Sequence, residues 1–130
     1  MLLMIVGMIP VYATHLMGGD ITLQDLGNQE YQVNLVTYRD TIGIPMAATA
    51  DIHFDGPNGA SFTITVPYDS VISGNLLPMY PYGVEVYFFT DTVTLAGNGQ
   101  WDVYWDNCCR NAAILNLNAP LTESMTLFTS

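Results

Sequence analysis

The sequence predicts an all-β domain that folds as a two-sheet antiparallel sandwich of about seven strands. Apolar and polar side chains alternate with a period of two in several runs, including residues 31–37 and 62–66. These runs are rich in β-branched and aromatic residues, which favour strands. Gly, Asn and Pro separate the runs, and no stretch sustains a helical period. Short strands at this spacing are typical of an Ig-like sandwich, and a small closed barrel is the alternative.

The first element is a predicted targeting segment. The run MLLMIVGMIPVY is apolar but shorter than the roughly 20 residues of a membrane span. It is typical of the apolar region of a signal peptide, and Val11 and Ala13 suit cleavage after Ala13. We therefore expect residues 1–13 to be a signal peptide and residues 14–130 to be the sandwich domain, with no membrane insertion after cleavage. A buried first strand is the alternative, which Pro10 disfavours.

Strands and turns then follow in order. The clearest turns are Gly27-Asn28, residues 55–59 and residues 97–99, and the last of these is predicted to close a hairpin. Residues 67–83 form the longest stretch without a strand pattern and are predicted to be a surface loop or a crossover between sheets. The predicted strands are residues 19–26, 30–39, 49–54, 60–66, 84–95, 100–106, 112–117 and 123–129.

The charge balance excludes two classes of partner. Lys and Arg together number 2 against 12 Asp and Glu, for a net charge of −10. Binding to nucleic acid or to anionic lipid depends on cationic side chains, so neither is expected. Half of the chain is hydrophobic, which also excludes a disordered acidic tail.

The strand at residues 100–106 supplies the candidate ligand-binding residues. Trp101 and Trp105 could stack on a sugar, Asp102 and Asp106 form a carboxylate pair on the same strand, and aspartates of loops such as residues 55–59 could bind Ca²⁺. The alternative is that the tryptophans belong to the core and that the acids only solvate the surface. The acids show no calcium-loop spacing, and His53 lies in a strand without a metal-binding or nucleophile motif. No catalytic residue, cofactor or metal site is predicted.

The two cysteines are adjacent, which leaves their pairing open. Neighbours in a strand point to opposite faces, and a bond between Cys108 and Cys109 would be strained. A vicinal disulfide, free thiols, a partner beyond Ser130 and a partner on another chain all remain as alternatives.

Several short blocks together resemble a known family. HLMGGDIT at residues 15–22, YQV at residues 31–33, YRD at residues 38–40 and CCRN at residues 108–111 lie along most of the domain, with Ile114 and Asn116 after them. They are similar to the N-terminal module of large secreted surface proteins of Bacteroidetes, of the PKD-domain and gliding-motility-associated type. That module opens on a Gly-Gly block, continues to YRDC and ends in CCRNxxIxN. The CCRN block is the most specific match.

The resemblance implies a non-catalytic extracellular sandwich that acts in adhesion or surface architecture, at the start of a longer protein exported by the type IX system. Its partners would be other domains of that protein and surface glycans or proteins. Thr41 stands where the family has the cysteine of YRDC, so that bridge cannot form. The motif residues are Arg39, Asp40, Cys108, Cys109, Arg110 and Asn111. We expect both arginines to form structural ion pairs with nearby acids such as Asp40 or Asp106.

Overall fold

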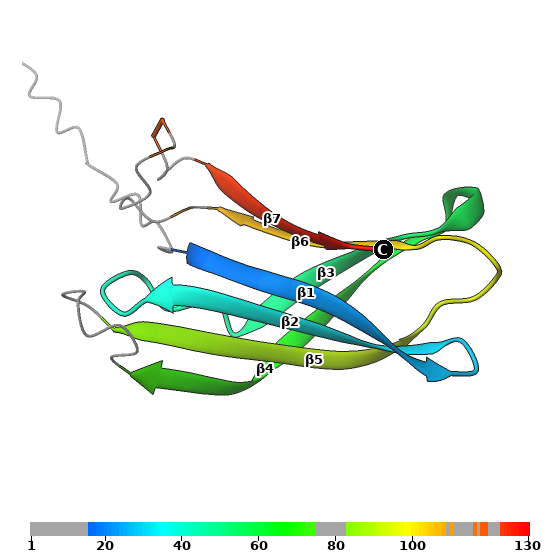
Figure 1. The fold of residues 1–130 in the computed structure, drawn as a ribbon, viewed down its shortest axis with the longest axis horizontal. Coiled ribbons are helices and arrows are strands. Elements are labelled where there is room, and N and C mark those ends of the chain that lie inside the picture. The colour runs from blue at the N-terminus through cyan, green and yellow to red at the C-terminus, as the bar shows by residue number, and fades with distance from the viewer. Residues whose placement is uncertain (1–15, 75–82, 109, 111–115, 117, 120–122) are drawn as a thin grey trace, which may run out of the picture.

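The computed structural model describes residues 16–74, 83–108, 110, 116, 118–119 and 123–130. They form an all-β, antiparallel structure with one short 3₁₀ turn (Figure 1). The elements are β1 (Leu16–Gly27), β2 (Glu30–Asp40), β3 (Thr49–Asp55), η1 (Pro57–Gly59), β4 (Ser61–Gly74), β5 (Val84–Thr94), β6 (Asp102–Cys108) and β7 (Ser124–Thr129). The predicted fold class is confirmed. The predicted signal peptide lies outside the described residues, as does the predicted strand at 112–117 apart from Asn116.

The strand order is β1-β2-β5-β4-β3-β6-β7, and β4 joins two layers. Its first half, from Ser61 to Pro67, pairs with β3, and its second half, from Tyr68 to Gly74, pairs with β5. One layer is therefore β1-β2-β5-β4, and the other is β4-β3-β6-β7 (Figure 1). In chain order this is the immunoglobulin arrangement, in which strands A, B, E and D oppose C, F and G. A bulge next to Tyr68 marks the point where β4 changes layer.

Two sequence predictions about connections are wrong. Residues 97–99 do not close a hairpin, because β5 pairs with β2 and β4 whereas β6 pairs with β3 and β7. This segment crosses between the layers. The predicted loop at residues 67–83 is a strand as far as Gly74, because pairing with β5 compensates for the weak alternation of its side chains. The turns at Gly27-Asn28 and at residues 55–59 are confirmed, with Gly27, Asn28, Asn58 and Gly59 all at positive φ.

The core lies between the layers and holds the inward side chains of each strand. Phe54, Phe89, Leu35, Ile52 and Val103 are fully buried. At the open side of the sandwich, β1 approaches β7 closely. A Cβ atom on Gly19 would lie 2.7 Å from Leu127 Cδ1 and 2.6 Å from the Val36 carbonyl oxygen. The second glycine of the Gly-Gly block therefore permits a backbone approach that a larger residue would obstruct.

Candidate functional site

The predicted ligand-binding residues on β6 are divided between two environments by the alternation of the strand. Trp105 is 2% exposed and belongs to the core, so of the two alternatives for this residue the core position holds and stacking on a sugar does not. Trp101 is half-buried, lies edge-on to Phe62 with ring centroids 5.7 Å apart, and covers Gly56. Asp102 and Asp106 lie on the opposite side of the strand, facing solvent, with Tyr104 between them.

A row of partly exposed aromatic side chains crosses this outer side of the second layer. The ring of His53 on β3 stacks on that of Tyr104 on β6, with centroids 5.0 Å apart and 27° between the planes. Tyr104 is in register with Phe128 on β7, which is 58% exposed. On the other side of His53, Thr63 on β4 places its Oγ1 atom 2.9 Å from His53 Nδ1. Two rings and a histidine thus lie side by side on three neighbouring strands.

Aspartates lie on both sides of the aromatic row. Asp55 and Asp102 are direct partners in the β3–β6 ladder, so two like charges face each other. On the other side of the row, Asp51 precedes His53 by two residues, and Asp106 follows Tyr104 by two. We call these outward side chains the outer acidic face: Asp51, His53, Asp55, Ser61, Thr63, Thr65, Asp102, Tyr104, Asp106, Thr126 and Phe128.

Hydrogen bonds hold the β3 aspartates in place without neutralising them. Ser61 Oγ donates to Asp55 at 2.8 Å, and Thr65 Oγ1 donates to Asp51 at 2.6 Å. Asp102 accepts from Gln100 Nε2 at 3.1 Å. Asp106 lies 3.8 Å from His53 Nε2, and its side chain is 54% exposed. The charge of Asp55 raises the pKa of the Tyr104 hydroxyl, with further contributions from burial, a hydrogen bond to Asp55 and the charge of Asp106.

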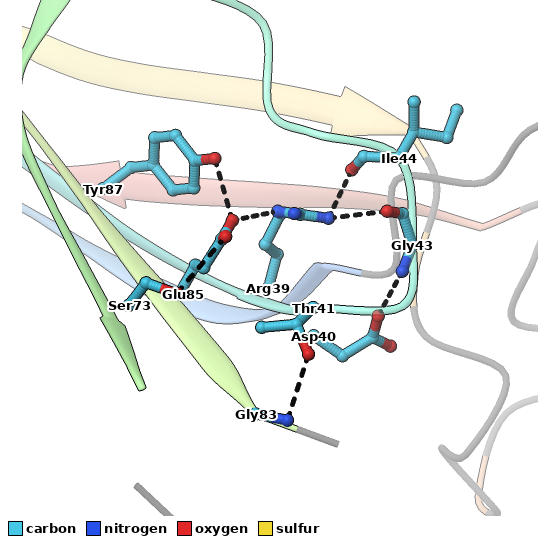
Figure 2. A network of polar contacts seen from close by, with 9 residues as sticks. All are labelled: Arg39, Asp40, Thr41, Gly43, Ile44, Ser73, Gly83, Glu85 and Tyr87. Atoms are coloured by element: carbon cyan, nitrogen blue, oxygen red, sulfur yellow. Dashed lines mark hydrogen bonds and ion pairs between the residues drawn. The ribbon is translucent and has the colours of Figure 1, made fainter. Parts of the chain in front are cut away.

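The YRD block builds a second polar site, between the layers at the far end of β2 (Figure 2). Arg39 is 4% exposed, and its Nε atom donates to Glu85 Oε2 at 2.7 Å. Its Nη1 atom donates to the carbonyls of Gly43 and Ile44 at 2.8 and 2.7 Å. Arg39 thus forms an ion pair with an acid, as expected, but the acid is Glu85; the Asp40 carboxylate accepts from the Gly43 amide at 2.8 Å.

Glu85 completes this network from β5. Tyr87 donates its hydroxyl proton to Glu85 at 2.9 Å, and Ser73 donates at 3.5 Å. Burial opposes ionisation of Glu85. Hydrogen bonds from Arg39, Tyr87 and Ser73, together with the charge of Arg39, nevertheless lower its pKa below the ordinary value. Burial and the hydrogen bond to Glu85 raise the pKa of Tyr87. The charged groups of this site are hydrogen-bonded to other residues of the same chain, so the site stabilises the fold by linking β2 to β5.

Thr41, the residue after the YRD block, forms two hydrogen bonds with Gly83. Its amide donates to the Gly83 carbonyl at 3.0 Å, and its Oγ1 atom accepts from the Gly83 amide at 3.0 Å. These two hydrogen bonds join the ends of β2 and β5 (Figure 2).

The CCRN block is described only in part. Cys108 ends β6 and is disulfide-bonded, so the alternative in which it stays a free thiol is wrong. The backbone of Arg110 forms an isolated parallel β-bridge with Leu16, and its amide donates to the Glu123 carbonyl at 3.1 Å. The expected ion pair of Arg110 with Asp40 or Asp106 is not formed among the described residues, and Arg110 Nε is buried without a hydrogen-bond partner. Cys109 and Asn111 lie outside the described residues.

A separate cavity of about 190 Å³ opens at the other end of the sandwich. It is lined mainly by apolar atoms of Leu23, Tyr31, Leu95, Gly99, Gln100, Trp101 and Ser130. Among the described residues, no group of three or more His, Cys, Asp or Glu side chains is placed to hold a metal ion. The same part of the chain contains no helix long and apolar enough to cross a membrane.

Sequence reasoning found Asp102 and Asp106 but missed the centre of the site. The signal was present, because His53, Tyr104 and Phe128 each occupy the polar positions of an alternating strand. Only the register of β3, β6 and β7 brings them side by side. Comparisons of the chain with protein-family models, curated proteins and solved structures find no match.

Proposed function

We propose that the chain is a non-catalytic adhesion or structural module of an exported cell-surface protein, and that it contacts its partners through the outer acidic face. The observation that carries the proposal is the row of His53, Tyr104 and Phe128 on the outer side of the second layer, in which His53 and Tyr104 are partly exposed and Phe128 is 58% exposed. An aromatic row that a core does not bury is typical of a contact surface.

Other features support export. The apolar leader precedes the domain, and Cys108 is disulfide-bonded, which is typical of proteins in oxidising compartments. The resemblance of the YRD and CCRN blocks to a secreted Bacteroidetes module points the same way.

Carbohydrate binding is a second candidate function, and the same row of side chains favours it. The stacking residues, however, differ from those predicted from the sequence. Tyr104 and Phe128, rather than Trp101 and Trp105, would provide the stacking surface. Calcium binding has no comparable support, because Asp55 and Asp102 form a pair with no third ligand among the described residues.

The test is an adhesion assay with beads that carry the exported chain. The N-terminus of the exported product should be Thr14, and coated beads should be retained on cell and glycan surfaces. The double variant Tyr104→Ala/Phe128→Ala should lose retention, because it removes the aromatic row. The control Tyr38→Ala removes a 40% exposed ring from the first layer and should leave retention unchanged. Equal retention of all three proteins would contradict the assignment of this face, and no retention of any would contradict adhesion.

A further inference from the structure

The arrangement of aspartates on the outer acidic face has an energetic cost that the fold does not require. Asp55 and Asp102 are directly opposite each other on adjacent strands. Like charges in that position destabilise a sheet. Only two cations exist in the whole chain, and Arg39 is buried with Glu85 while Arg110 forms no ion pair with a described carboxylate. The charges on this face are therefore left for a partner to balance.

From this arrangement we propose that the outer acidic face binds an extended basic peptide segment, with arginine or lysine at every second position. The inference rests on the proposed function and names the chemistry of the partner. Its three contact points are the Asp55–Asp102 pair, the ring of Tyr104, and Asp51 with Asp106. A guanidinium or ammonium group is attracted to carboxylates, and the methylene stem of an arginine or lysine can pack against the aromatic row while its head group reaches them.

The spacing of the aspartates defines the spacing of the cations. Asp51 and Asp55 are four residues apart on β3, as are Asp102 and Asp106 on β6. At about 3.3 Å per residue, the two acidic positions lie about 13 Å apart along the strands. An extended peptide has the same rise, so cations at positions i and i+4 reach both positions. A cation at i+2 then lies over the aromatic row.

Charge complementarity favours this partner over a sugar. A sugar hydroxyl needs acceptors and donors, and the outer acidic face has four carboxylates but no amide, lysine or arginine, with His53 as its one basic side chain. The hydroxyls of Ser61, Thr63 and Thr65 are already engaged with Asp55, His53 and Asp51. Aromatic rings beside unpaired carboxylates are better matched to arginine or lysine.

The experiment compares two peptides of identical composition by titration of the exported chain. In one, three arginines alternate with glycines; in the other, the three arginines are adjacent. The alternating peptide should bind several-fold more tightly, and raising salt from about 0.05 to about 0.5 M should weaken it strongly. The variant Asp55→Asn/Asp102→Asn should lose about tenfold in affinity. The control Asp20→Asn/Asp69→Asn makes the same change in net charge on exposed residues of β1 and β4. It should bind the alternating peptide with the affinity of the wild type.

Three outcomes would overturn the inference: equal affinity for the two peptides, equal losses in the face and control variants, or no measurable binding of either peptide. A second variant, Asp51→Asn/Asp106→Asn, guards against a folding defect in the first. A glycan array probed with the same proteins separates this inference from the proposed function. Glycan binding through Tyr104 and Phe128 without peptide binding would reject the basic partner and leave the adhesion module standing.

Discussion

Two polar regions of this sandwich treat their charges in opposite ways. At one end, Arg39 and Glu85 are paired between the layers, and every contact they make is with another part of the chain. On the outside of the second layer, Asp55 and Asp102 face each other without a cation. The first arrangement is one that folding selects, since burying an unpaired charge is costly. Folding tolerates the second arrangement without gaining stability from it. This indicates that a requirement other than stability keeps these aspartates in place.

The comparison also separates the YRD block from the outer acidic face. YRD serves the fold directly, because Arg39 ties β2 to β5 and to the loop at Gly43 and Ile44. The outer acidic face lies outside the YRD and CCRN blocks and is built by residues of β3, β6 and β7 that no motif covers.

The largest effect should come from removing the buried cation. Arg39→Ala leaves Glu85 without its counter-charge and leaves the Gly43 and Ile44 carbonyls without donors. We expect a loss of about 3–5 kcal/mol in the free energy of unfolding, measured by urea titration. Arg110→Ala is the matched control, because it has no ion pair with a described carboxylate, and it should cost about 1 kcal/mol. Equal losses for the two arginines would break the distinction between a paired and an unpaired cation.

The acid dependence of stability should arise in the same region. The folded chain lowers the pKa of Glu85 below its ordinary value of 4.5. A lowered pKa gives stability that is present above the unfolded value and is lost as the pH falls through the folded value. The wild type should therefore exceed Glu85→Gln in unfolding free energy at about pH 6, and the difference should shrink toward about pH 3. A gap between wild type and Glu85→Gln that stays constant over this pH range would reject the linkage.

Much of the fold is predictable from local pattern, and little of the site is. The alternation in β2, β3 and β6 gives the strands and their inward faces, since a period of two is a local property. The length of β4 is not predictable in this way, because residues after Pro67 become a strand only by pairing with β5. An ion pair for Arg39 is predictable from the sequence, but its partner is not, because Glu85 is 46 residues away along the chain. The same limit applies to His53 and Tyr104, whose contact depends on the β3–β6 register.

The smallest predicted effect has the opposite sign from the others. Asp55→Asn/Asp102→Asn removes two like charges that face each other across a strand pair, and asparagine keeps an oxygen that Ser61 and Gln100 can donate to. We expect the variant to be more stable than the wild type by about 0.2–1 kcal/mol, measured by urea unfolding at low salt, and the gain to shrink at high salt. Asp20→Asn/Asp69→Asn makes the same charge change away from the face and should give a smaller gain. A substitution that strengthens the fold while weakening peptide binding would place the Asp55–Asp102 pair under selection for binding. A loss of stability would instead make this pair part of the scaffold, as Arg39 and Glu85 are.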